Sequence, residues 1–255
     1  MRVGRIFSSF VALTFLSGCA MAQTQQPSSA EGVPTHVVVT VEPKKGSAVP
    51  VINQDDVMVY EKRTRDRVTE WTPATGDHAA AGKSLRLPLG IGGANASPYF
   101  SLSDLVKRWP DDGAPRRAVM MITDGIDQYY GGFNLQDPYL DAAIDDALRA
   151  HVMVSAIYEP AAGHFGHSYW ETYWGQLYLA EVADQTGGEA YYIGFTGPPV
   201  AFAPYLDQMA TRLSHQYLLT FLAQRPKKAG WQTIRLACEQ PNVDLVSARR
   251  VWVTP

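Results

Sequence analysis

The segment that most constrains the fold is residues 116–125, with the sequence Arg-Arg-Ala-Val-Met-Met-Ile-Thr-Asp-Gly. An apolar run bounded by charged residues is typical of a strand buried on both faces, as strands of parallel sheets are. The run ends in Thr-Asp-Gly, which places the Asp124 carboxylate at the carboxyl tip of the predicted strand. Ligands and metals bind at that edge in open α/β sheets. We therefore expect a buried strand here and a functional role for Asp124.

The pattern after residue 97 predicts an α/β fold. Segments with helical periodicity alternate with short apolar runs, which is typical of a parallel or mixed sheet with helices on both faces. Ser97 and Asp137 each precede a proline, the pattern of an N-cap followed by proline in the first helical turn. The expected helices are 97–109, 137–151, 169–186 and 202–215, and the strands between them are 117–123, 152–158 and 190–193. A hairpin and a last strand are then expected, at 217–223, 231–238 and 250–253.

We divide the chain into four parts. Residues 1–22 are typical of a signal peptide, and residues 23–34 form a polar, turn-rich linker. Residues 35–76 are expected to form a small β-rich lead-in. Its three strand patterns lie at 35–42, 58–62 and 67–71. Residues 77–255 hold the main α/β domain.

The first residues have the features of an export signal. Arg2 and Arg5 precede an apolar stretch that is too short to span a membrane as a helix. Leu16-Ser-Gly-Cys19 resembles a bacterial lipoprotein box, in which Cys19 becomes the lipidated N-terminus. Residues 20–22, Ala-Met-Ala, also fit cleavage by an ordinary signal peptidase. Both predict export to the periplasm or the outer cell envelope, and the favoured lipoprotein box adds a lipid anchor in the membrane.

Charge and cysteine content narrow the possible partners. The net charge of -3 and the pI near 6.1 leave no basic stripe, which argues against a nucleic-acid partner. Cys19 and Cys238 are the two cysteines, so the exported chain has no internal disulfide framework. Cys238 ends an alternating strand pattern and is expected to be a small buried apolar residue.

On these features the chain resembles a von Willebrand factor type A domain of the exported bacterial type. Three matches carry the resemblance: the lead-in at residues 46–61, Ser97 at the start of a helix, and Ile-Thr-Asp-Gly at residues 122–125. The resemblance implies a Rossmann-like sheet with helices on both faces. It also implies a metal-ion-dependent adhesion site, in which Mg²⁺ or Mn²⁺ bridges to a carboxylate of a partner protein. In this chain the implied metal ligands are Asp124 and Ser97.

The chain departs from the family at one motif. Asp-x-Ser-x-Ser, which follows the first core strand of the family, has no match here, and that strand and its helix have no counterpart between residues 71 and 79. The predicted domain is therefore incomplete and its metal site degenerate, and capping roles for Asp124 and Ser97 are the favoured alternative. Without the missing strand, residues 118–123 have one unpaired edge unless residues 67–71 or a partner chain cover it.

Two further groups of residues could carry chemistry. His164 and His167 lie in a Gly-rich loop and could share a transition metal. Asp124, Asp127 and Asp137 flank one loop, Asp141, Asp145 and Asp146 follow on the next helix, and such a cluster could bind Ca²⁺ or serve in acid/base chemistry. Asp141 and Asp145 are spaced i,i+4 on a helix surface, for which solvated charge is the commoner explanation. These groups define the alternative function, a divalent-metal-dependent hydrolase that uses Asp124, His164 and His167.

The predicted helix at 169–186 begins with an unusual density of aromatic residues. Trp170, Tyr173, Trp174 and Leu177 share one helical face at i, i+3, i+4 and i+7. Burial of this face in the core is the favoured interpretation. The alternative is a surface for a partner, because tyrosine and tryptophan suit interfaces.

We predict from the sequence an exported, envelope-associated protein-protein interaction module of the adhesion type, not an enzyme. The expected partner is a protein, bound through loops at the Asp124 end of the sheet, with Mg²⁺ or Mn²⁺ at a degenerate site. The hydrolase is one alternative, and a shortened relic without function is the other.

Overall fold

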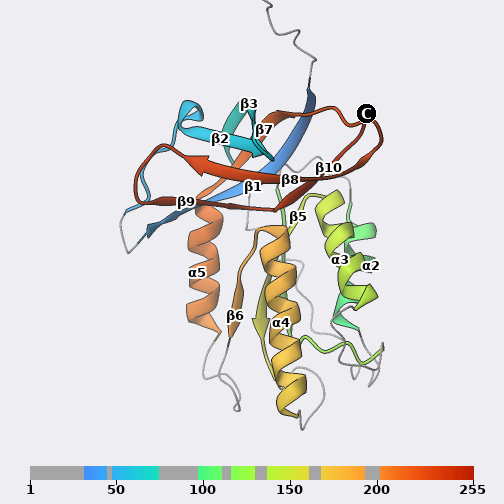
Figure 1. The fold of residues 1–255 in the computed structure, drawn as a ribbon. Coiled ribbons are helices and arrows are strands. Elements are labelled where there is room, and N and C mark those ends of the chain that lie inside the picture. Colours follow the sequence, from blue (N-terminus) through green and yellow to red (C-terminus); the bar gives the residue numbers. More distant parts are fainter. Residues whose placement is uncertain are drawn as a thin grey trace, which may run out of the picture. The chain divides into compact units, whose positions relative to one another are not determined.

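Two β-sheets and four α-helices make up the part of the chain that the structure describes (Figure 1). The structure is a computed structural model and describes residues 32–44, 48–74, 97–110, 116–129, 137–160, 168–192 and 202–255. Residues 31–255 form one compact unit. The signal peptide, Cys19 and most of the linker lie outside the described residues, so the predictions for the leader remain predictions.

The larger sheet is antiparallel and curled, with the strand order β10-β8-β2-β3-β7-β1-β9 (Figure 1). Its strands are β1 (Val33–Pro43), β2 (Val57–Glu61), β3 (Thr64–Pro73), β7 (Gln216–Ala223), β8 (Gly230–Cys238), β9 (Val243–Ser247) and β10 (Arg250–Val253). Alternate residues face the core, as in β2, where Val57, Val59 and Glu61 are buried. The three strands at residues 35–76 therefore share one sheet with the last four strands of the chain.

The predicted hairpin between residues 217–223 and 231–238 is wrong. β7 pairs with β1 and β3, whereas β8 pairs with β2 and β10. β9 has no counterpart among the predicted strands. Turn residues between two strand patterns favour a hairpin locally, but here strands from the N-terminal part of the chain take up the pairing edges.

The smaller sheet is parallel, with the order β4-β5-β6. Its strands are β4 (Arg117–Thr123), β5 (Val152–Tyr158) and β6 (Ala190–Tyr192). The helices are α2 (Pro98–Lys107), α3 (Pro138–Arg149), α4 (Tyr169–Thr186) and α5 (Ala203–Ser214). Ser97 and Asp137 cap α2 and α3, as predicted, and Gly187 ends α4 with a φ of +82°.

Helices cover both faces of the parallel sheet, which confirms the predicted α/β class. On one face, α2, α3 and α4 pack against Val154 and Ala156 of β5. On the other face, Phe202 and Tyr205 at the start of α5 pack against Ile157 and Tyr191. The alternation along β5 thus sends successive side chains into two separate apolar clusters.

β4 packs against an apolar cluster on each face, through Val119 and Met121 on one side and Met120 on the other, but it is less buried than predicted. Every residue of β5 is buried, whereas no residue of β4 is, and Ile122 keeps 47% of its surface exposed. The reason is that β4 lies at an edge and has β5 as its one strand partner among the described residues. Residues 67–71, one of the expected covers of this edge, pair with β7 instead. The predicted unpaired edge is confirmed for the described part of the chain.

Candidate functional site

The carboxyl end of the parallel sheet gathers four buried carboxyl groups. Asp124 and Asp127 lie in the loop after β4, Glu159 follows β5, and Asp137 caps α3. None of the four residues is more than 6% exposed. Parallel strands end at one edge of their sheet, and the helices that follow begin there, so the topology brings these residues to the same end of the domain.

Ser97 caps α2 and also binds the loop after β4. Its hydroxyl oxygen accepts a hydrogen bond from the Phe100 amide at 3.0 Å and donates one to Asp127 Oδ2 at 2.6 Å. The buried Tyr99 hydroxyl donates to the Gly125 carbonyl oxygen at 2.7 Å. The first turn of α2 is therefore bonded to the loop after β4 at two points, and Ser97 makes the contacts of an N-cap residue.

Asp124 makes the contacts of a loop-capping residue. Its Oδ1 accepts hydrogen bonds from the Ile126 amide at 3.1 Å and from the Thr123 hydroxyl at 3.3 Å. These bonds close the turn at Gly125, where φ is +71° and a Cβ would lie 2.3 Å from the carbonyl oxygen of Gly175. A side chain at position 125 would therefore meet both strain and a clash with α4, so glycine is required.

Asp137 keeps one oxygen without a hydrogen bond. Its Oδ1 accepts from the Tyr139 amide at 2.8 Å and the Leu140 amide at 3.3 Å, whereas its buried Oδ2 has no hydrogen-bond partner among the described residues. Burial raises the pKa of Asp137, and the negative charge of Asp127 adds to the shift against these two amides. Burial, followed by the nearby negative charges, also raises the pKa of Tyr99 well above its usual value. Negative charge is therefore costly at this end of the sheet.

The donor types at this site suit a hard divalent cation. Such ions take hydroxyl, carboxylate and carbonyl oxygens, and the site offers Ser97 Oγ, three aspartate side chains and the unpartnered Asp137 Oδ2. No group of three His, Cys, Asp or Glu side chains in the described ranges is arranged to hold a metal ion. The chemistry of the donors thus fits Mg²⁺ or Mn²⁺, although the side chains stand in their capping positions.

Two aspartates outside the predicted ligand pair lie at this end of the sheet. Asp127, which binds Ser97, and Asp137 belong to the carboxylate cluster seen in the sequence, whereas the resemblance implies only Asp124 and Ser97 as ligands. The signal was present, because Asp127 follows Asp124 by three residues and Asp137 occupies an N-cap. His164 and His167 of the hydrolase alternative lie outside the described residues.

The aromatic face of α4 is a second candidate surface. Tyr169 is 70% exposed and Trp170 61% exposed, and Tyr173 and Leu177 are exposed as well. We call these four residues the aromatic ridge. Their rings touch edge to face, with centroids 5.6 Å apart for Tyr169 and Trp170 and 6.3 Å apart for Trp170 and Tyr173. The exposed rings of the ridge therefore restrain one another through edge-to-face contacts.

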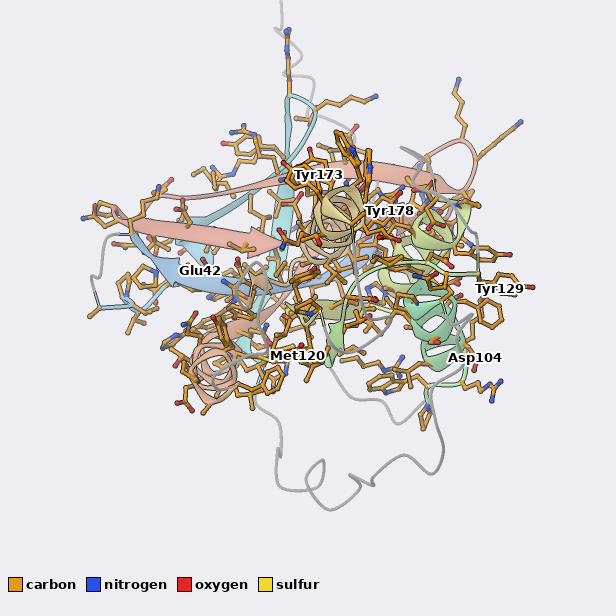
Figure 2. All side chains as sticks on the ribbon, turned by 90° about the horizontal axis from the view of Figure 1, so that it is seen from below. Glu42, Asp104, Met120, Tyr129, Tyr173 and Tyr178 are labelled. Carbon is orange, nitrogen blue, oxygen red and sulfur yellow. The ribbon has the colours of Figure 1, made fainter. Side chains whose placement is uncertain are left out.

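The favoured prediction that this face enters the core is wrong for the ridge. Trp174 alone of the four predicted residues packs against the core. The buried side of α4 consists instead of Gly175, Tyr178, Leu179, Val182 and Ala183. Figure 2 shows Tyr173 pointing away from the sheet and Tyr178 pointing toward α3. Gly175 decides this rotation, since a Cβ there would lie 2.1 Å from the Asp124 carbonyl oxygen, so this side of the helix is the one that meets the β4 loop.

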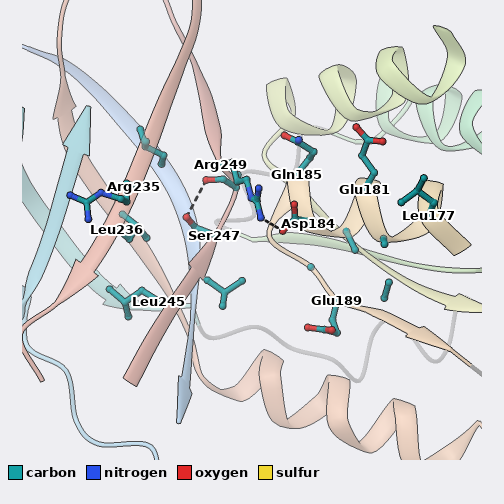
Figure 3. Close-up of a pocket in the computed structure, with 17 residues that line it drawn as sticks. Leu177, Glu181, Asp184, Gln185, Glu189, Arg235, Leu236, Leu245, Ser247 and Arg249 are labelled. Carbon is teal, nitrogen blue, oxygen red and sulfur yellow. Dashed lines mark hydrogen bonds and ion pairs between the residues drawn. The ribbon is translucent and has the colours of Figure 1, made fainter. Parts of the chain in front are cut away.

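A groove of about 860 Å³ lies between α4, β6 and the strands β8 and β9 (Figure 3). Asp184 in its wall forms an ion pair with Arg249 at 2.6 Å, and Glu189 forms one with Arg212 at 3.0 Å. Burial raises the pKa of Glu181, and the charges of Asp141 and Asp184 add to this shift. None of the predicted site residues lines this groove.

No protein-family model matches the chain, and no curated protein or solved structure matches it either. None of the described helices is long and apolar enough to cross a membrane. The resemblance to von Willebrand factor type A domains therefore depends on residues 46–61, Ser97 and residues 122–125 alone.

Proposed function

We propose that this protein is an exported protein-interaction module of the cell envelope, tethered by a lipid on Cys19. It binds a partner protein at the carboxyl end of the parallel sheet and along the aromatic ridge of α4. The parallel layer would be a von Willebrand factor type A domain that lacks its first core strand and helix. In support, β4 ends in Thr-Asp-Gly, and the helix that begins at Ser97 is bonded to the loop after it.

The exposure of the ridge is the observation that carries this proposal. Isolated exposed apolar residues are ordinary, but a contiguous set of tyrosine, tryptophan and leucine on one helix marks an interaction surface. Tyrosine and tryptophan contribute most to binding in protein interfaces, because they bury a large area and lose few rotamers. The edge-to-face contacts restrain these rings before any partner binds, which lowers the entropic cost of association.

The metal is a second, separable part of the proposal. Asp124, Ser97 and Asp127 would hold Mg²⁺ or Mn²⁺, and the ion would offset the negative charge buried at this end. Adhesion-type function would then depend on the metal as well as on the ridge.

Photo-crosslinking in the envelope of the native host tests the ridge. A photoreactive phenylalanine derivative at Trp170 or Tyr173 is expected to give a discrete crosslinked protein, whereas the same group at Val51, which is 80% exposed on another part of the chain, is not. Adding Leu177→Ala should reduce the yield from Tyr173. Equal crosslinking from Val51, or none from either ridge position, would contradict the proposed function.

Thermal unfolding with and without Mg²⁺ or Mn²⁺ tests the metal. An ion that binds only the folded protein increases the free energy of unfolding by mass action, by about 2.7 kcal/mol at one hundred times its Kd, and so raises the unfolding midpoint. We expect this rise in the parent protein and its loss in Asp124→Asn, which keeps the size of the side chain. An unfolding midpoint that does not change with either ion would contradict the metal part of the proposal, while partner binding by the aromatic ridge would stand.

A further inference from the structure

Two buried carboxyl groups are neighbours across the β2–β3 hairpin. Val59 pairs with Asp66 and Glu61 pairs with Thr64, so Glu61 and Asp66 lie diagonally opposite on one face of the sheet. That face is the buried one, and the two acidic residues are 5% and 6% exposed. Glu61 Oε1 also accepts a hydrogen bond at 3.0 Å from the amide of Gln224, which follows the end of β7. The two acids and this amide therefore connect three neighbouring strands, β2, β3 and β7.

No basic side chain in the described part of the chain forms an ion pair with either carboxyl group. Arg65 and Arg67 of β3 point to the face opposite Asp66, because side chains alternate along a strand. Arg235 of β8 lies over the ring of Tyr60, also on the opposite face, with 4.8 Å between the guanidinium carbon and the ring centroid. The basic residues of the adjoining turns are exposed: Lys62, Arg63 and Arg225.

Two ionised carboxylates in this position would be unfavourable. Each would lose most of its hydration, and the two negative charges would repel each other. Burial raises the pKa of both groups against the hydrogen bonds from Gln224, and the charge of Asp66 adds to the shift of Glu61. Asp66 Oδ2 is buried and has no hydrogen-bond partner among the described residues. A proton on one group would remove one charge and let its hydroxyl donate a hydrogen bond to the other.

We infer that Glu61 and Asp66 share one proton, and that this proton holds the β2–β3 hairpin to the end of β7 as a pH-sensitive latch. When the proton passes to solvent, two carboxylates are left side by side, and opening of the hairpin lets water reach them. The inference goes beyond the proposed function and involves neither the aromatic ridge nor the carboxyl end of the parallel sheet. β1 and β7 pair on the other side without such a pair of acids, so the opening is confined to the hairpin.

Amide hydrogen exchange of the full-length protein at pH 5 and pH 8, corrected for the intrinsic effect of pH, tests the latch. Protection of residues 59–66 is expected to fall about 10- to 100-fold between these pH values, because the opened state binds the proton less tightly. The amides that join β1 to β7 should keep their protection. Glu61→Gln, which cannot ionise, should stay protected at both pH values. Glu239→Gln, an exposed residue, is the matched control and should behave as the parent does.

Carbon-13 NMR of the carboxyl groups tests the shared proton in the parent protein without any substitution. Glu61 and Asp66 are expected to titrate in two steps as one coupled pair, and Asp66→Asn should leave Glu61 with a single step at lower pH. Two independent titrations at ordinary pH values would overturn the inference. Protection of residues 59–66 that does not change between pH 5 and pH 8, or that is lost equally from β1 and β7, would overturn it as well.

Discussion

β4 and β5 are seven-residue apolar strands that pair along their whole length, yet one is buried and the other is not. The contrast is sharpest at the directly paired residues Ile122 and Ile157. Ile122 is 47% exposed, whereas Ile157 is fully buried. Apolar composition is nearly the same in the two strands, so the difference comes from position. Within the described part of the chain, β5 has a strand on each side and β4 has one on a single side.

In the antiparallel sheet, a carboxyl group on an interior strand is also buried. β2 lies between β8 and β3, and its last residue, Glu61, is only 5% exposed. An interior strand here buries a carboxyl group, while an edge strand leaves an isoleucine in water. In both comparisons the residue on the interior strand is the buried one, whatever the polarity of its side chain.

The largest expected effect comes from truncating the two paired isoleucines. Ile157→Ala should lower the free energy of unfolding by about 2–5 kcal/mol, because it leaves a cavity in a closed core. Ile122→Ala should cost about 1 kcal/mol or less, since much of its surface is already hydrated. Urea unfolding at low protein concentration measures both. Equal losses would mean that the edge of β4 is buried in solution.

The buried carboxyl group of β2 makes stability depend on pH. Burial raises the pKa of Glu61 from 4.5 to about 7, with the Gln224 amide opposing the shift and the charge of Asp66 adding to it. The folded state thus holds this proton more tightly, so the stability that Glu61 contributes is fully present below pH 4.5 and is lost as the pH rises to about 7. At about 1.4 kcal/mol per pH unit between pH 4.5 and about 7, the loss is at most about 3–4 kcal/mol.

Glu61→Gln should flatten this pH dependence and raise the unfolding midpoint at pH 8, because the amide mimics the protonated acid. Thermal unfolding between pH 5 and pH 8 measures the slope. The exposed Glu239→Gln should leave the slope as in the parent. A parent whose stability rises over this interval would contradict the assignment to Glu61.

A smaller effect is expected where α2 holds the end of β4. Tyr99→Phe removes the hydroxyl that binds the Gly125 carbonyl oxygen and leaves a buried acceptor, at a cost of about 1–2 kcal/mol. The half-exposed Tyr173→Phe is the matched control and should have no measurable effect. If both variants unfold like the parent, α2 does not restrain the edge strand.

Amide hydrogen exchange changes nothing in the protein and compares the strands directly. At low protein concentration, those amides of β4 that point away from β5 should exchange about 100-fold faster than the amides of residues 156–158, which lie between β4 and β6. Slow exchange at every concentration would show that a segment of the same chain covers the edge.

Local signals predicted the elements well. The bounds of α4 and β5 agree with the predictions at both ends, and the caps at Ser97 and Asp137 are where the proline pattern placed them. Caps and turns depend on residues a few positions apart, which a sequence displays directly. The same reasoning placed Asp124 at the carboxyl end of β4 and favoured a capping role for it.

Neither the pairing of the strands nor the buried side of α4 could be predicted from local signals. β7 pairs with β1 and β3, and β8 pairs with β2, all from the first part of the chain. No local sequence pattern indicates these pairings. In α4, apolar and aromatic residues occur around the whole helix, so periodicity could not tell the buried side from the ridge. Asp127 joined Ser97 only because α2 packs beside the loop after β4.

The sequence by itself determined where the helices and strands of the α/β layer begin and end, and that a carboxylate follows β4. The tertiary structure alone decided that β4 is an edge, that the aromatic ridge faces solvent, and that Ser97 binds Asp127. The physical reason is range: hydrogen bonding and capping within an element depend on near neighbours in the chain. Burial depends on which distant segment packs alongside, and that is settled only when the whole chain has folded.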